Sequence, residues 1–315
     1  MDSTLSPQAS LYSRGDGASP HRNGKNFQVR RIHNVFSCDK AAMMAIEKKT
    51  CTVSGHTIAY LHSGSGEPVL LVHGITTYSF IWRKIIPSLA EEYEVLAVDL
   101  LGCGDSDKPV NVSYAIKDHA ERLKEFAATL GIRKLHFVGH DLGGGMGQIL
   151  AVRFPELLYD LTMINTVGYD YWPVQPIVAM RTPIFRQFLM ATMDLGAFGL
   201  IVKRGLYHKE RFTPELMDLF MKPMLKPGGR KAFLHFAKCL DSQDLMEIAK
   251  ELRELAVPVL IIRGEADPYL GAVISEKLHG EIPGSLLIRI PTGGHFIQED
   301  EPEQLAREIK AFFKR

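Results

Sequence analysis

Short apolar runs alternate along this chain with longer amphipathic stretches. Two β-prone runs near the start, residues 49–53 and 56–61, are separated by Ser54-Gly55, which is typical of a hairpin. Runs without polar alternation are expected of parallel strands that helices cover on both faces. Such runs occur at residues 68–72, 93–98, 135–138, 161–165, 257–262 and 285–290. The pattern predicts an α/β protein with a mostly parallel, doubly wound sheet.

The stretches between the apolar runs carry helical periodicity. We expect a helix to begin near residue 79, and others at residues 114–130, 146–152 and 303–313. A long segment before the run at 257–262 has helical patterns but little strand character, most clearly at residues 184–193, 214–221 and 230–240. We therefore predict an α/β core formed by residues 47–166 and 249–315, and a helical insertion formed by residues 167–248.

The start of the chain differs in composition from the rest. It is rich in Ser, Gly, Pro, Asn and Arg and lacks apolar periodicity, so we expect residues 1–46 to form a disordered tail. This stretch shows no apolar segment typical of a secretory signal. Because this stretch contains basic residues, a transit peptide remains an alternative interpretation. A compact start of translation at Met43 or Met44 is another.

Charge and cysteine content exclude several classes of partner. The 37 Lys and Arg residues balance 36 Asp and Glu residues, so no net charge would recruit nucleic acid or a membrane surface. No apolar run approaches the ~20 residues that span a bilayer. The scattered cysteines predict free thiols in a reducing, cytoplasmic setting, and no metal site. They are Cys38, Cys51, Cys103 and Cys239.

A glycine-rich stretch lies between the apolar run at 135–138 and the helix after it. It reads Gly139-His140-Asp141-Leu142-Gly143 and continues into Gly144 and Gly145. A strand, a sharp turn and a helix are the context in which a G-x-S-x-G elbow presents a nucleophile above a sheet. Small residues allow the strand and the helix to pass closely. Because Asp141 occupies the central position, we predict an aspartate nucleophile.

Two later residues lie just past the ends of the last two predicted strands, namely Asp267 and His295. The carboxyl ends of parallel strands collect at one edge of a sheet, and nucleophile, acid and histidine is the chain order expected there. We therefore predict a catalytic triad of Asp141, Asp267 and His295, with Asp170 as the second candidate for the acid. His73 is expected to support its loop through hydrogen bonds, and the same holds for His140.

Three motifs together resemble those of the α/β-hydrolase superfamily. They are His73-Gly74, the turn from Asp99 to Ser106 with its two glycines, and the elbow around Asp141. The aspartate at the elbow is similar to the branch that contains epoxide hydrolases and haloalkane dehalogenases. The resemblance covers about residues 48–315. It implies an α/β-hydrolase fold in which the insertion is a helical cap, no cofactor, and a small apolar organic substrate that reacts with water.

The predicted triad implies a mechanism with two steps. An aspartate with a reference pKa of about 3.9 is ionised near neutral pH, so Asp141 could attack an electrophilic carbon without a base and form an alkyl-enzyme ester. His295, oriented by Asp267, would then deprotonate the water that hydrolyses the ester. The backbone N–H of Leu142 and, by resemblance, that of Ile75 would bind the oxyanion.

Departures from the family pattern bear on the electrophile. Haloalkane dehalogenases usually carry a tryptophan after the aspartate and an asparagine after the His-Gly pair, where this chain has Leu142 and Ile75. An apolar epoxide, which needs only a proton donor for its opening oxygen, is therefore the predicted substrate. Candidate donors are Tyr169, Tyr171 and Tyr207, with Tyr78 in the His-Gly loop. A dehalogenase using Trp82 or Trp172 is a competing hypothesis, and so is a ligand sensor without turnover.

Overall fold

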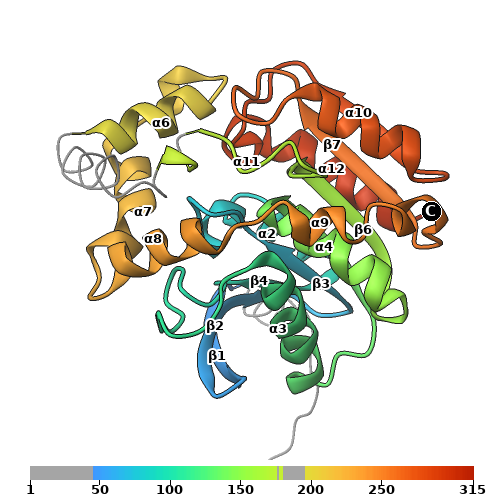
Figure 1. The fold of residues 1–315 in the computed structure, drawn as a ribbon, viewed down its shortest axis with the longest axis horizontal. Coiled ribbons are helices and arrows are strands. Elements are labelled where there is room, and N and C mark those ends of the chain that lie inside the picture. The colour runs from blue at the N-terminus through green and yellow to red at the C-terminus, as the bar shows by residue number, and fades with distance from the viewer. Residues whose placement is uncertain (1–44, 176, 180–195) are drawn as a thin grey trace, which may run out of the picture.

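The structure, a computed structural model, describes residues 45–175, 177–179 and 196–315. Its centre is an eight-stranded sheet in the order β1-β2-β4-β3-β5-β6-β7-β8 (Figure 1). β2 pairs antiparallel with β1 and β4, and the other neighbouring strands pair parallel. The strands are β1 (Glu47–Val53), β2 (His56–Ser63), β3 (Glu67–Val72), β4 (Tyr93–Val98), β5 (Leu135–Asp141), β6 (Leu158–Thr166), β7 (Val259–Gly264) and β8 (Leu286–Ile290). The predicted fold class is confirmed.

The apolar runs coincide with strands because their side chains fill both faces of the sheet. Residues 69–72 of β3 and the whole of β5 are buried, as expected of central strands. β5 is longer than its apolar run, since backbone pairing with β6 continues through polar His140 to Asp141. The predicted hairpin is also present, with Val53 opposite His56.

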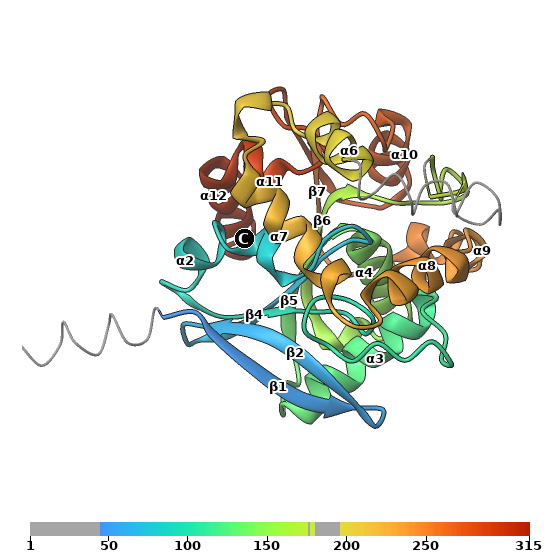
Figure 2. The same cartoon turned by 90° about the vertical axis from the view of Figure 1, so that its left-hand side faces the viewer.

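Helices cover both faces of the sheet (Figure 2). α2 packs against α12 on one side, and α3 packs against α4 on the other. The helix expected near residue 79 is a short 3-10 turn, η1 (Ser79–Trp82), followed by α2 (Ile86–Leu89). The remaining helices of the core are α3 (Ile116–Thr129), α4 (Leu142–Arg153), η2 (Pro155–Leu157), α10 (Ala272–Glu281), α11 (Ile297–Asp300) and α12 (Pro302–Phe313).

The segment between β6 and β7 forms helices and turns in its described residues, 167–175, 177–179 and 196–248, and we call these residues the insertion. Its helices are α6 (Ala197–Gly205), η4 (Lys209–Arg211), α7 (Pro214–Leu225), α8 (Gly229–Cys239) and α9 (Gln243–Met246), and η5 (Glu251–Glu254) leads into β7. α7 and α8 fall where they were predicted. The helix predicted at 184–193 lies outside the described residues, as do residues 1–44 of the predicted tail.

Polar contacts join the insertion to the core at several points. His235 of α8 donates from Nε2 to the carbonyl of Val112, 2.7 Å away. Lys226, just after α7, forms an ion pair with Asp105 in the loop after β4. Where the chain is described, no helix is long and apolar enough to cross a membrane.

Candidate active site

Asp141 ends β5 and directly precedes α4. Its backbone has φ 54° and ψ −117°, a strained conformation for a residue with a side chain. Strand and helix pass so closely that a Cβ on Gly139 would collide with the backbone of Gly143 and Gly144. The sequence therefore folds locally into the expected strand–turn–helix elbow, which presents the carboxylate of a buried residue at the end of the sheet.

Backbone N–H groups face the Asp141 carboxylate. The N–H of Ile75 donates to Oδ2 of Asp141 over 3.2 Å, and the N–H of Leu142 also acts on this carboxylate by lowering its pKa. Gly74 is required next to it, because a Cβ there would collide with the Asp141 side chain. The two residues expected to bind an oxyanion thus have their N–H groups directed at the predicted nucleophile.

His73 holds the Ile75 loop in place. The backbone N–H of Leu100 donates to Nε2 of His73 over 3.0 Å, so the ring proton resides on Nδ1, which donates to the carbonyl of Gly74 over 2.7 Å. Burial lowers the pKa of His73 and keeps the ring neutral. This histidine has the supporting position that the sequence predicted.

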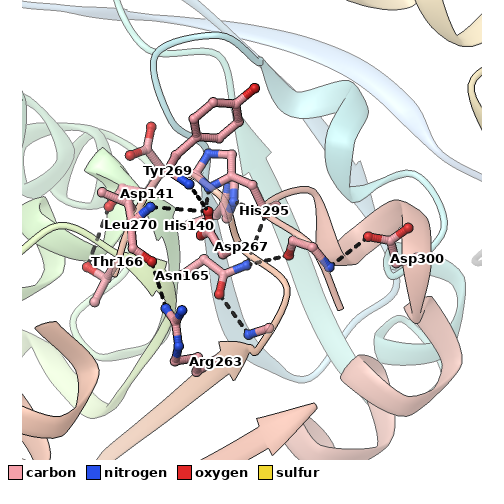
Figure 3. Close-up of polar contacts among 12 residues, drawn as sticks. His140, Asp141, Asn165, Thr166, Arg263, Asp267, Tyr269, Leu270, His295 and Asp300 are labelled. Carbon is pink, nitrogen blue, oxygen red and sulfur yellow. Dashed lines mark hydrogen bonds and ion pairs between the residues drawn. The ribbon is translucent and has the colours of Figure 1, made fainter. Parts of the chain in front are cut away.

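His295 and Asp267 form a buried pair beyond the ends of β8 and β7 (Figure 3). Nδ1 of His295 donates to Oδ2 of Asp267 over 2.9 Å. The other carboxylate oxygen of Asp267 accepts the backbone N–H of Tyr269 at 2.8 Å and that of Leu270 at 3.2 Å. These bonds fix the histidine tautomer, which leaves Nε2 as the ring nitrogen that can take up a proton.

The charges of Asp267 and Asp141 both favour the protonated form of His295. Burial alone would lower the pKa of His295, but the negative charge of Asp267, their hydrogen bond and the charge of Asp141 raise it above its ordinary value. Burial would raise the pKa of Asp267, and the pairing with His295 and the backbone N–H groups outweigh that effect, so this pKa is lowered. Asp267 is therefore a stable anion that favours a protonated His295.

Asp141 is in a less favourable electrostatic position. Burial raises its pKa above the ordinary value, despite the opposing effects of His295 and the N–H groups of Ile75 and Leu142. A carboxylate with reduced solvation is a stronger nucleophile, but it is ionised only above this raised pKa.

Asp141 and His295 line one cavity, which we call the reaction cavity. Its empty volume is about 510 Å³, and its wall is largely apolar. The lining residues come from the core and from the insertion, and they are Ile75, Thr76, Asp141, Val174, Gln175, Ile177, Phe198, Ile201, Tyr269, Leu270, His295 and Phe296. An apolar molecule held here would lie beside both the nucleophile and the base.

The tyrosines expected to donate a proton do not line this cavity. The hydroxyl of Tyr169 donates to Oε2 of Glu281 over 3.0 Å, while Tyr171 and Tyr207 are 39% and 43% exposed. Tyr78 is buried against Phe80. The cavity instead receives Tyr269, whose hydroxyl donates to the carbonyl of Ile201 over 2.6 Å and whose ring meets that of His295 edge-on. Tyr269 is therefore the tyrosine among the lining residues of this cavity, and a donor role for Tyr169, Tyr171 or Tyr207 stays a prediction.

Asp170 and the two tryptophans named from the sequence lie away from the site. Asp170 is exposed, and the carboxylate that pairs with His295 belongs to Asp267. Trp82 and Trp172 are buried but are not among the lining residues of the reaction cavity.

Sequence reasoning missed Asn165, which ties the histidine loop to the sheet (Figure 3). Its Nδ2 donates to the carbonyl of Gly294 over 2.8 Å, and its Oδ1 accepts the N–H of Gly264 over 2.8 Å. His140 adds a bond from Nε2 to the carbonyl of His295 over 2.8 Å, and burial lowers its pKa to about 3. The position of Asn165 at the carboxyl end of β6 was a usable signal.

Asp300 is the second missed residue, and it is fully buried. Its Oδ2 accepts the N–H of Gly294 and that of Tyr207, each over 2.9 Å, and its Oδ1 accepts the N–H of His208 over 3.0 Å. One carboxylate therefore joins the histidine loop to the insertion. Within residues 45–315, leaving aside 176 and 180–195, no cluster of His, Cys, Asp and Glu could hold a metal ion.

Comparisons with known proteins agree with this geometry. The family model for the alpha/beta hydrolase fold matches residues 67–302. Haloalkane dehalogenase 2 of Mycobacterium tuberculosis is 28% identical over 268 residues, which cover 80% of this chain and 90% of that protein. Cis-3-alkyl-4-alkyloxetan-2-one decarboxylase of Shewanella oneidensis is 26% identical over 273 residues, covering 82% and 86%. The solved epoxide hydrolase CorEH has the same fold, with a TM-score of 0.75 at 24% identity over 86% of this chain and 99% of that one.

Proposed function

Because the chain belongs to the alpha/beta hydrolase fold family, we propose that this hydrolase opens an apolar epoxide through a covalent ester on Asp141. The observation that carries the proposal is the position of the Asp141 carboxylate. It lines an apolar cavity together with His295, and the backbone N–H groups of Ile75 and Leu142 act on it. An aspartate placed in this way can attack a carbon atom held in the cavity and later bear the charge of a tetrahedral intermediate.

In the first step, an oxygen of Asp141 attacks one carbon of the epoxide ring. An ester C–O bond forms, and the ring C–O bond to the same carbon breaks. The apolar wall brings the electrophile against the nucleophile and excludes water, which would otherwise solvate the carboxylate.

In the second step, Nε2 of His295 takes a proton from water, and the water oxygen attacks the carboxyl carbon of Asp141. The N–H groups of Ile75 and Leu142 stabilise the oxyanion. The ester C–O bond then breaks, the diol leaves with the proton from His295, and Asp141 retains one oxygen atom from water. Asp267 stabilises the protonated histidine throughout.

The opening oxygen also needs a proton in the first step. Tyr269 is the strongest acid among the hydroxyl groups that line the reaction cavity, although burial raises its pKa to about 12. Its hydroxyl hydrogen would turn from the carbonyl of Ile201 toward the substrate oxygen. The phenolate would regain its proton after the second step, when the second hydrogen of the attacking water leaves the Asp141 carboxyl group. Tyr269→Phe should slow alkylation of Asp141 by about 10²-fold or more, whereas Tyr171→Phe should not.

The insertion serves in this proposal as the cap predicted from the sequence. Val174, Ile177, Phe198 and Ile201 of the insertion contribute apolar walls to the reaction cavity. Their chemistry supports an apolar substrate over a charged one. The free thiols of the described cysteines, Cys51, Cys103 and Cys239, are consistent with the cytoplasmic setting that we also propose.

A haloalkane is the second candidate, because a relative is named as a haloalkane dehalogenase. A leaving halide has to be held by N–H donors, yet both tryptophans of the chain lie outside the lining of the reaction cavity. The name of the Shewanella relative describes a strained four-membered oxygen ring with alkyl substituents. That substrate class is closer to a strained epoxide than to a haloalkane, so the epoxide remains the leading proposal.

The proposal is tested by trapping the ester. His295→Gln removes the base of the second step, so incubation with an apolar epoxide should leave Asp141 modified by the mass of the intact epoxide. The matched control is His56→Gln, at a position on the β1–β2 hairpin that is distant in sequence from the site. This variant should show no adduct at steady state. Peptide mass spectrometry reads both. Bromoalkanes and β-lactones are included as competing electrophiles, and an Asp141 peptide that no epoxide modifies would refute the proposal.

A further inference from the structure

A second cavity adjoins the reaction cavity, and about 320 Å³ of atom-free space, part of it open to solvent, lies between its walls. It lies between the loop after β4, which contributes Cys103 to its lining, and the insertion, which contributes Phe220, Met224 and Phe233. The mechanism derived above makes no use of it.

The two cavities share part of their wall. Ile75 and Thr76 line both of them, and these residues belong to the loop whose N–H faces Asp141. Phe220 of the second cavity packs edge-on against Phe296 of the reaction cavity, with ring centroids 4.9 Å apart. The partition between the cavities therefore includes the side chains of two buried phenylalanines.

The chemistry of the second cavity is apolar. Its lining contains no charged side chain, and burial raises the pKa of the Cys103 thiol to about 12, so that thiol is neutral. The hydroxyl of Thr77 is directed at the carbonyl of Gly74, 3.4 Å away. A hydrocarbon chain could fill this space without leaving a charge unpaired.

We propose that the second cavity binds a second apolar arm of the substrate. The electrophile is then an internal epoxide that carries an alkyl group on each ring carbon. One arm lies in the reaction cavity beside Phe198, and the other passes Thr76 into the second cavity. This inference rests on the proposed function for the chemistry at Asp141, and it adds the shape of the substrate.

Isomeric epoxides test the proposal in the full chain. The terminal epoxide of octane and the central cis epoxide of octane have the same atoms and nearly the same hydrophobicity, but only the second has two arms. The protein should prefer the central isomer in kcat/KM, since each buried methylene contributes about fourfold to binding. A preference for the terminal isomer would overturn the proposal.

Filling the second cavity should remove the preference. Cys103→Leu adds carbon atoms to its wall, so the ratio of kcat/KM between the central and terminal isomers should fall at least about tenfold. Cys51→Leu on β1 is the matched control and should leave that ratio unchanged. Phe233→Trp fills the cavity from the insertion and serves if Cys103→Leu does not fold. An unchanged ratio in the folded filling variant contradicts the proposal.

A binding measurement separates this proposal from the proposed reaction. The central ketone nonan-5-one and the near-terminal ketone nonan-2-one have no ring for Asp141 to open, and calorimetry compares their affinities. If the central ketone binds more tightly, and Cys103→Leu abolishes this difference in affinity, the result supports a binding site for a second arm, even if no epoxide is hydrolysed. Equal affinities overturn the second arm, even if epoxides modify Asp141.

Discussion

Two histidine–carboxylate pairs lie at opposite edges of the same parallel sheet, on different strands. His295 and Asp267 follow the carboxyl ends of β8 and β7, with Nδ1 and Oδ2 2.9 Å apart. His136 and Asp160 lie near the amino ends of β5 and β6, with the same atoms 2.7 Å apart. All four residues are buried. Hydrogen-bond geometry alone therefore does not distinguish a catalytic pair from a structural one.

The surroundings of the second ring nitrogen make the difference. His295 lines the reaction cavity beside Asp141. The ring of His136 stacks on Phe313 with centroids 4.1 Å apart and meets the ring of Tyr93 edge-on. His295 and the backbone N–H groups that Asp267 accepts lower the pKa of Asp267. Burial instead raises the pKa of Asp160. A base needs an accessible nitrogen and a stable anion behind it, and only the first pair has both.

The largest contrast is expected in turnover. Asp267→Asn would leave the shape of the site intact but favour the wrong tautomer of His295, so kcat should fall by about 10⁴. Asp160→Asn, the same chemical change at the other pair, should alter kcat by less than about threefold. Steady-state kinetics on one epoxide compares them. Similar losses in the two variants would show that the pairs are not functionally distinct.

Stability should show the opposite contrast. His136→Ala removes the partner of a buried carboxylate whose Oδ1 already lacks a hydrogen-bond partner among the described residues, so it should destabilise the fold by about 3 kcal/mol. His295→Ala leaves a carboxylate, Asp267, that still accepts the N–H groups of Tyr269 and Leu270, and should cost about 1 kcal/mol. Urea unfolding followed by circular dichroism measures both. Equal costs would contradict the structural assignment of His136.

The pH dependence of ester hydrolysis sharpens the comparison at His295. Its pKa is raised, and only the neutral ring can accept a proton from water, so the rate should rise with pH through a midpoint above the ordinary value of about 6.5. Below the midpoint the rate should fall about tenfold per pH unit. Single-turnover experiments isolate this step. In Asp267→Asn the midpoint should move to lower pH, and a fixed midpoint would show that Asp267 does not set it.

The smallest effect concerns the stability cost of the nucleophile. Burial raises the Asp141 pKa above its unfolded value, so stability is lost as pH rises from the unfolded pKa through the folded one. Asp141→Asn removes this loss and should stabilise the fold at neutral pH by about 1 kcal/mol. Asp170→Asn, at an exposed position, should have no such effect. Thermal unfolding at two pH values tests the prediction, and an equal stabilisation near pH 3 would refute its electrostatic origin.

Site residues that come directly after a predicted strand could be predicted from the sequence. The strand runs located the carboxyl edge of the sheet, and Asp141, Asp267 and His295 follow strands that end there. The glycines around Asp141 are readable because the close packing of β5 and α4 excludes larger residues. Small residues around a turn can thus indicate from the sequence alone that its backbone is strained.

The proton donor that we propose, Tyr269, could not be predicted in this way, because a loop residue is directed by its backbone rather than by its type. Tyr169 has φ 52°, and its hydroxyl reaches Glu281 on α10. Tyr269 lies two residues after Asp267. Its backbone N–H donates a hydrogen bond to the Asp267 carboxylate, and this bond brings the tyrosine ring to the cavity. Neither the sign of φ nor the partner of a hydroxyl is visible in a residue pattern.

The buried carboxylate of Asp300 has a consequence for evolution and engineering. It binds the backbone of the histidine loop and that of the insertion at once, through Gly294, Tyr207 and His208. A helical segment transplanted from a relative would have to supply two N–H groups at the same place, or leave a buried anion half satisfied. An exchange of the insertion would therefore have to include the loop that carries His295, whereas a substitution within the insertion leaves the contact at Asp300 in place.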